Sequence, residues 1–524
     1  MSTPSTSTLP GASHRWWTQF HIVLIALAMS FTGWLALREG STRYLAPLKA
    51  HDAQEIQQEA IRQAKLLRES ASLDNIARYS PELATLTKGS PDARRFVDSK
   101  LVEHGLYLAQ MPRLNQVLLA AHIFTGVACM LLGGWQFWPA FRQRFMRLHR
   151  LIGGIYVLTV PISVLLAFAY LGVTPPHRLY TQLTAWVALW MFGSLALLSV
   201  FMAVRALRQK RIHEHMGFMA LSFACMLVAP MLRLNWVALA WLFPHIDQET
   251  LSLVTMAIML PECLLIGYSL MLANRQYHRT LSRRPMAPLA SLSTRWFETL
   301  SPLLYLLSAG LAAVLLRHLV NGTGLSSSLS AHQLVNAALL SREDTVLSAH
   351  PVVRITFAVA VALALTGGLH LLRRLLQPAQ PAQALDHKAV KGQAVVVWAS
   401  ATMAGLSATR LGWDMGLAAD RQWLSGGALL TTGGLLVLGF ATAFGLALGR
   451  RHLGMMKECL VFLLSLLPFY ALTLVNVWAL QWLPIPPDYI AQGQGYVLAA
   501  GSSMVLMVGA MFYAIFGQAG REHG

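Results

Sequence analysis

The stretch LHRLIGGIYVLTVPISVLLAFAYLG, residues 148–172, decides the fold of this chain. After His149 and Arg150 it runs uncharged for about twenty residues, which is enough for one helix to cross a bilayer. Similar stretches recur along almost the whole 524 residues, and the mean hydropathy is +0.50. Charged residues make up only 12% of the chain, about half of what soluble domains carry. The sequence therefore predicts an all-α integral membrane protein.

The net charge of +18 would suit a nucleic-acid-binding protein, but the distribution of basic residues argues against that class. They gather at alternate ends of the predicted helices, around residues 142–150, 205–211 and 275–284. This is the positive-inside pattern, and it predicts that both termini lie in the cytoplasm. The first apolar stretch, about 20–37, is too long for a signal-peptide core and predicts a retained anchor.

The hydropathy pattern predicts twelve membrane spans, at about residues 20–37, 115–138, 151–172, 179–205, 216–243, 251–273, 295–318, 351–372, 392–412, 423–449, 453–482 and 493–516. The predicted regions are a cytoplasmic tail with a signal-anchor helix (1–37), an extracytoplasmic segment (38–112), a first membrane bundle (113–273), a cytoplasmic linker (274–294), a seventh helix with an outer loop (295–349) and a second, degenerate bundle (350–524).

The extracytoplasmic segment contains one clear helical run, Asp52 to Ser70, with Ile56, Ile61 and Leu66 or Leu67 near one face. This predicts a small helical cap, through which the protein would bind an extracytoplasmic partner. A disordered linker is the alternative.

The twelve spans are predicted to be two copies of six. His149 with Gly154 corresponds to His387 with Gly392, and His215-Met216-Gly217 corresponds to His452-Leu453-Gly454. Three further matches follow the same order. Both copies start on the same side, so the repeats are parallel, and each is expected to contain a core like a four-helix bundle.

His149 and His215 start the third and fifth spans, which are diagonal partners in an up-down four-helix bundle. Two neutral imidazoles that face each other can bind the iron of a b-type haem, and a nearby arginine such as Arg150 can pair with a propionate. Tyr156 completes this candidate site, while His387 and His452 are its degenerate copy. The alternative is that both histidines are polar residues at the lipid interface.

No other metal site is expected. The four cysteines lie in apolar helices and show no CxxC spacing, so neither a disulfide framework nor structural zinc is predicted.

Three further polar residues are predicted inside the membrane. His122 lies within the second span, where a titratable residue is by default a functional candidate, and we expect it to be hydrogen-bonded. Arg233 and Glu262 lie about equally far from the loop between the fifth and sixth spans, and hence at the same depth. The sequence therefore predicts an ion pair between them, either structural or anchoring a quinone, haem or transported group.

The motifs of the first half are His122, then Gly133 with Gln136-Phe137, then Leu148-His149-Arg150 with Gly153 and Tyr156, then Trp186 and Trp190, and finally His215, Phe218-Met219, Ser222-Phe223-Ala224 and Leu232-Arg233-Leu234. They resemble the motifs of a bacterial family of predicted membrane proteins, domain-of-unknown-function family 2306. Phe218 departs from the family pattern, which has Trp there. The resemblance covers about residues 112–273 and implies a bacterial cytoplasmic membrane location, but no established activity.

These observations favour a membrane electron-transfer component that binds haem b and meets a quinone or another redox partner. The alternatives are a secondary transporter, since twelve spans in two halves fit that class, and a non-catalytic membrane scaffold. The first inner loop lacks the G-x-x-x-D-R/K pattern of major-facilitator transporters. The lipid bilayer is the one partner that every alternative shares.

Overall fold

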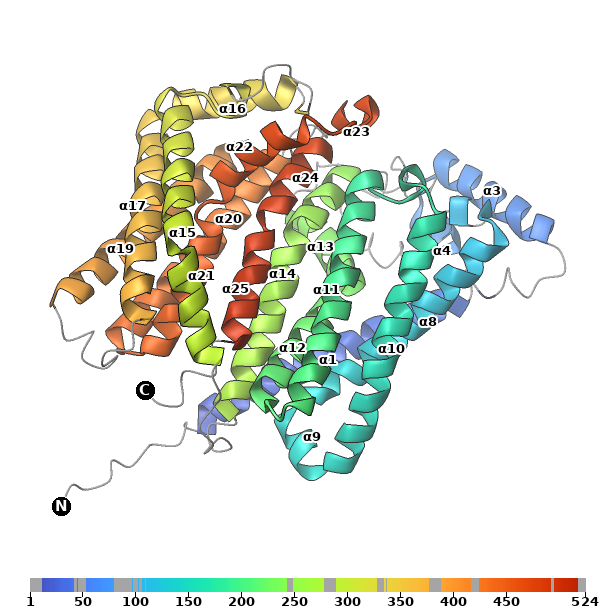
Figure 1. Cartoon of the computed structure of the whole chain (residues 1–524). Coiled ribbons are helices and arrows are strands. Elements are labelled where there is room, and N and C mark those ends of the chain that lie inside the picture. The colour runs from blue at the N-terminus through green and yellow to red at the C-terminus, as the bar shows by residue number, and fades with distance from the viewer. Residues whose placement is uncertain are drawn as a thin grey trace.

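The computed structural model describes residues 12–41, 45, 53–79, 97, 102, 106–108, 110–242, 248–277, 289–327, 334–335, 337–376, 388–415, 424–491 and 494–516. All regular structure in these residues is helical, as Figure 1 shows. Eleven helices are long and apolar enough to cross a membrane, and a bent pair of shorter helices raises the number to as many as twelve. The predicted all-α, multi-pass membrane class is therefore confirmed.

The first half of the chain contains α1 (Ala12–Gly40), α8 (Arg113–Gln136), α9 (Pro139–Arg144), α10 (Met146–Val173), α11 (Gln182–Arg208), α12 (Ile212–Cys225), α13 (Val228–Leu242) and α14 (Gln248–Tyr277). The second half contains α15 (Leu289–Val320), α16 (Ala337–Ala349), α17 (Pro351–Leu376), α19 (Lys388–Met415), α20 (Leu424–Gly449), α21 (Leu453–Leu466), α22 (Phe469–Leu480), α23 (Pro487–Ala491), α24 (Gln494–Ser503) and α25 (Val505–Phe516).

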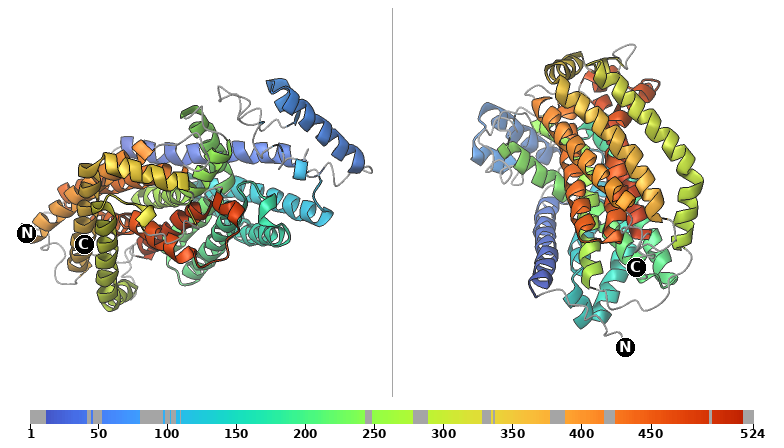
Figure 2. Two further views of the ribbon diagram at one scale, coloured as in Figure 1. Left: turned by 90° about the horizontal axis from the view of Figure 1, so that it is seen from above. Right: turned by 90° about the vertical axis from the view of Figure 1, so that its left-hand side faces the viewer.

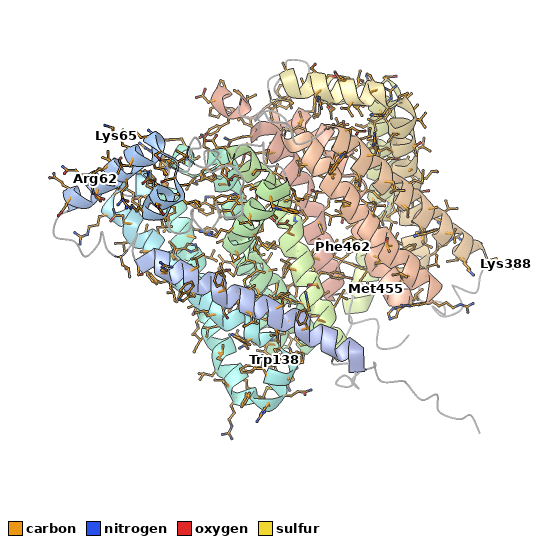
Figure 3. The ribbon with its side chains drawn as sticks, turned by 180° about the vertical axis from the view of Figure 1, so that it is seen from behind. Arg62, Lys65, Trp138, Lys388, Met455 and Phe462 are labelled. Carbon is orange, nitrogen blue, oxygen red and sulfur yellow. The ribbon has the colours of Figure 1, made fainter. Side chains whose placement is uncertain are left out.

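Four helices of the first half pack around a common centre. α8 packs on α10, α10 on α11 and α11 on α12, while α12 closes the circuit against α8. α10 and α12 are consequently diagonal partners. α14 covers α12 and α13, and α1 crosses the face of this bundle obliquely while packing on α8 (Figure 3).

The second half packs in the same cyclic order, with α17 on α19, α19 on α20, α20 on α21 and α21 back on α17. Glycines let α19 and α20 approach unusually closely. A Cβ added at Gly434 would lie 2.6 Å from the backbone nitrogen of Thr409 and 2.8 Å from the Gly405 carbonyl oxygen. Small residues commonly serve this purpose between membrane helices.

α12 and α13 are bent by 55° relative to each other at residues 226–227, and together they are long and apolar enough for a broken span. Pro230 explains the bend, because it has no N–H to donate to the carbonyl of Met226 and its ring collides with that carbonyl. The bend tilts α13 away from the line of α12, which shapes the cavity described below.

The two halves meet chiefly where α14 packs on α20, α24 and α25, and where α12 packs on α25. Phe218 of α12 contacts Phe512 and Phe516 of α25, with ring centroids 5.3 and 5.1 Å apart. Tyr268 of α14 donates a hydrogen bond to Glu458 Oε2 of α21 over 2.8 Å. The interface is thus largely apolar, with a buried polar contact within it.

The two ends of the membrane helices differ. α9, the end of α11 and the start of α12 lie at one end, together with the start of α1 and the end of α25 (Figure 1). We call this the basic end, because residues 142–150 and 205–211 gather there. α16 lies across the opposite end, where α3 (Ala53–Glu69) and α4 (Leu73–Tyr79) stand beside the membrane helices (Figure 2).

The predicted helix over residues 52–70 is confirmed by α3. Ala64 and Leu67 are buried, together with Ile76 of α4, whereas Ile61 is 46% exposed. Leu67 lies three residues after Ala64, so these two share one face, and α4 selects that face by packing against it.

Candidate functional site

The centre of the first bundle is marked by a hydrogen bond that crosses it. The hydroxyl groups of Tyr156 on α10 and Ser222 on α12 are 3.3 Å apart, and both residues are buried. The faces of α10 and α12 that carry these two residues therefore point toward each other.

His149 lies seven residues before Tyr156, and His215 lies seven residues before Ser222. Seven residues make about two helical turns, so each histidine shares a face with its partner and lies about 10 Å nearer the basic end. The imidazoles are close enough to interact electrostatically, and Arg142 acts on both. The structure thus places His149 and His215 on the facing sides of α10 and α12, in line with Tyr156 and Ser222.

Hydrogen bonds distinguish the nitrogens of the two imidazoles. His215 Nδ1 lies 3.0 Å from the carbonyl oxygen of Ala203, and since a carbonyl can only accept, Nδ1 carries the proton. Its Nε2 then has a free lone pair, the arrangement found in most metal-binding histidines. His149 Nδ1 is buried and has no hydrogen-bond partner among the described residues.

Two further buried polar side chains, one on α8 and one on α9, complete a set with His149, His215, Tyr156 and Ser222. We call this set the layer. Gln136, at the end of α8, is 6% exposed, and neither atom of its amide has a partner among the described residues. Arg142 of α9 is 7% exposed, and its Nη2 donates to Asn274 Oδ1 over 2.5 Å. The basic-loop pattern predicts Arg142 at the surface, so its burial is a difference that sequence reasoning missed.

The donor set fits a b-type haem by residue type. Two imidazoles lie on diagonal helices, one of them with a defined free nitrogen, and arginines stand beside them for propionates. Arg150 is exposed at the basic end. The unpaired amide of Gln136 and Nδ1 of His149 also indicate a polar occupant, because buried polar groups are rarely left without a partner.

Comparison with known proteins bears on this layer of residues. Residues 119–270 match the family of predicted membrane proteins described as DUF2306. This segment belongs to DUF2306. No curated protein and no solved structure matches the chain significantly.

The DUF2306 segment contains every residue of the layer, while Asn274 lies just beyond it. Gln136, His149, Tyr156, His215 and Ser222 come from three motifs of the resemblance, and the fold places them on helices of one bundle. Gly153 also belongs there, since a Cβ at this position would lie 3.4 Å from Gln136 Oε1.

The degenerate copy does not repeat this arrangement in the described residues. His452 is exposed, and its Nδ1 accepts a hydrogen bond from the backbone N–H of Met455 over 3.2 Å. It therefore caps the start of α21. His387 lies outside the described residues.

The described residues show no direct ion pair between Arg233 and Glu262, the closer of the two arrangements expected for them. Asn235 Nδ2 donates to Glu262 Oε2 over 2.6 Å instead, while Arg233 Nη1 donates to the Ala229 carbonyl oxygen over 2.9 Å. Residues two apart on a helix point in different directions, so Asn235 faces α14 when Arg233 does not. Counting residues from the loop predicts how deep each side chain lies in the membrane, but not the direction in which it points.

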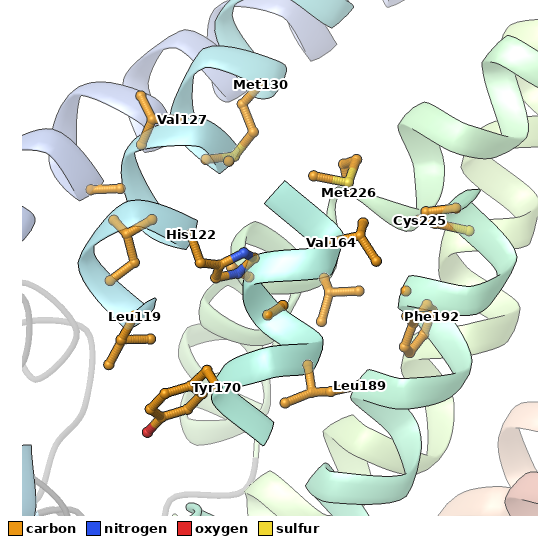
Figure 4. A pocket seen from close by; sticks show the side chains of 18 of the residues that line it. Leu119, His122, Val127, Met130, Val164, Tyr170, Leu189, Phe192, Cys225 and Met226 are labelled. Carbon is orange, nitrogen blue, oxygen red and sulfur yellow. The ribbon is translucent and has the colours of Figure 1, made fainter. Parts of the chain in front are cut away.

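His122 is hydrogen-bonded, as the sequence predicts. Its Nδ1 lies 2.9 Å from the carbonyl oxygen of Ser163 on α10. His122 and Arg233 both line a cavity of about 290 Å³ in the DUF2306 segment, enclosed by α1, α8, α10, α11 and the bent span α12–α13 (Figure 4).

Two carboxyl groups in the second half were also missed. Glu458 is fully buried and accepts from Tyr268, as described above. Glu343 of α16 is 4% exposed, and it accepts from the hydroxyl of Tyr470 over 2.5 Å and from the backbone N–H of Leu325 over 2.7 Å. Burial raises the pKa of Glu343 to about 7. The sequence could have identified Glu458, because it lies within an apolar run. Glu343 lies in a polar segment, so nothing in the sequence marked it as buried.

Proposed function

We propose that the DUF2306 segment is a haem b-binding electron-transfer module, with His149 and His215 as the axial ligands. One observation carries this proposal. The faces of α10 and α12 that bear the two histidines are opposed across the bundle, as the contact between Tyr156 and Ser222 requires.

The surrounding residues would have separate tasks. The carbonyl oxygen of Ala203 accepts a hydrogen bond from Nδ1 of His215, which keeps Nε2 unprotonated and available for iron. Arg142 and Arg150 would attract the propionates. Tyr156 and Ser222 would close the site toward the membrane interior, since both are buried and bonded to each other. A bound haem would supply one-electron redox chemistry at this end of the membrane.

The positive-inside rule supports placing the basic end in the bacterial cytoplasm. The candidate haem site and both termini would then lie at the cytoplasmic side. The segment at residues 38–112 would lie outside, where α3 and α4 would be available to a partner.

The packing order supports an internal duplication into two parallel six-helix repeats. In each half four helices close a circuit in the same order, and the fourth of them is the first member of an interrupted helix pair, α12–α13 or α21–α22. Asn235 contacts Glu262 of α14, and its counterpart Asn476 donates to Ser503 of α24 over 3.0 Å. The second copy would have lost the ligands and kept the scaffold.

The experiment is a measurement of haem per chain in purified protein. Wild type should bind haem, and His149→Ala and His215→Ala should each lose it, while His452→Ala should bind as wild type does because His452 only caps a helix.

A variant that retains a ligand guards against misfolding. His149→Met should keep haem and raise its reduction potential, because methionine in place of histidine favours the reduced iron. Haem content that is unchanged in both alanine variants, or absent from wild type, would contradict the proposal.

A further inference from the structure

The cavity between α1 and the four-helix bundle is separate from the histidine pair at the basic end. Its walls are almost entirely apolar, with Leu119, Val164 and Phe192 among them, and His122 also lines it (Figure 4). Arg233 is its other basic group. Ligand cavities in proteins commonly combine apolar walls with a few polar groups that fix orientation. The bend after Cys225 opens this space, since Met226, Val228 and Ala229 also line it.

His122 presents a defined hydrogen-bonding group. Its Nδ1 lies 2.9 Å from the Ser163 carbonyl oxygen and 3.2 Å from the Ser163 hydroxyl oxygen. The carbonyl can only accept, and the hydroxyl donates its own proton to the His122 carbonyl oxygen over 3.3 Å, so Nδ1 carries the proton. In the neutral ring Nε2 is then an acceptor and requires a donor from the ligand. Arg233 donates from Nη1 to the Ala229 carbonyl oxygen, and its guanidinium carries only N–H donors, so a ligand group beside it must be an acceptor.

A ligand that suits both groups has an apolar body, a hydroxyl that donates to His122 and a second oxygen that accepts from Arg233. We propose that this cavity binds the ring of an isoprenoid quinol, with one ring hydroxyl on His122 Nε2 and the opposite oxygen toward Arg233. This inference deepens the proposed electron-transfer function, since a quinol is an electron donor of the membrane. An ionised fatty acid fits less well, because its carboxylate has no proton for His122.

The test is equilibrium binding of a decyl benzoquinol, kept reduced under anaerobic conditions, to the full-length protein in lipid nanodiscs. His122→Leu should weaken binding about tenfold, which corresponds to about 1.4 kcal/mol and to the loss of one hydrogen bond. His122→Gln should restore most of it, because its amide can donate to Ser163 and accept from the ligand. Oleate should compete poorly.

Two glycines provide a matched pair of variants. Gly126 lines the cavity, and a Cβ there would meet only Ser163 Oγ, at 3.6 Å, so Gly126→Leu should fold and fill the space. Gly172 is exposed on α10 and a Cβ there would meet nothing within 4 Å, so Gly172→Leu should bind quinol as wild type does.

Unchanged affinity in His122→Leu or in Gly126→Leu would overturn the inference. Equal binding of oleate and quinol would also overturn it, since the cavity would then hold lipid chains. A haem band without quinol binding would overturn this inference alone. Quinol binding without a haem band would contradict the proposed haem site alone.

Discussion

Replacing Gly133 with alanine tests the packing that brings α10 and α12 together. A Cβ at Gly133 of α8 would lie 2.5 Å from Phe223 Cδ2 and 2.9 Å from Tyr156 Cε2. Neither ring can swing aside, because Tyr156 is 1% exposed and Phe223 is fully buried. Overpacking of this kind costs about 1–3 kcal/mol. The displaced Tyr156 would also lose its contact with Ser222, on which the opposed histidine faces depend.

Gly126→Ala on the same helix is the matched control. A Cβ there meets only Ser163 Oγ, at the ordinary distance of 3.6 Å. Both substitutions gain about the same helix propensity, up to about 1 kcal/mol, so the difference between them isolates the steric cost. When the two purified variants are unfolded in the same detergent, the free energy of unfolding of Gly133→Ala should be about 1–3 kcal/mol lower than that of Gly126→Ala. Equal stability of the two variants would refute the packing argument.

Three further outcomes are expected. Asn235→Leu should lower the free energy of unfolding by about 1–3 kcal/mol, because the Glu262 carboxyl loses its partner, and adding Glu262→Leu should recover stability. A double variant that is less stable than Asn235→Leu alone would contradict this. Tyr268→Phe should lower the unfolding temperature, because Glu458 loses the hydrogen bond that joins the two halves, and an unchanged temperature would contradict that role. Glu343 has its pKa raised from 4.5 to about 7, so its protonated form is favoured in the folded chain. Stability should therefore fall by up to about 3 kcal/mol as the pH rises from about 4.5 to about 7, and Glu343→Gln should remove that slope, measured by unfolding at a series of pH values.

Much of the fold could be predicted because the bilayer imposes a simple rule. An uncharged run of about twenty residues is long enough to be a spanning helix, so hydropathy alone predicted twelve spans where the described residues contain eleven, or up to twelve. The α10–α12 diagonal followed from the span order.

What the sequence did not predict is the direction in which a side chain points, as opposed to its depth in the membrane. Arg233 and Asn235 differ by two positions, and the packing of α13 on α14 turns Asn235 toward Glu262. Arg142 resembles a surface residue of a basic loop, yet α9 turns it inward to Asn274. A single sequence contains the residues but not the tertiary packing that selects their partners.

The measurement that tests the central claim most directly is the visible absorption spectrum of the purified wild-type chain, recorded before and after reduction with dithionite. Bis-histidine ligation by His149 and His215 predicts a reduced b-type band, which the His149→Ala and His215→Ala proteins lack and the His122→Ala protein retains. A wild-type protein purified from haem-sufficient cells that shows no such band would contradict the electron-transfer account, and a transporter would become the better reading of the twelve-span fold.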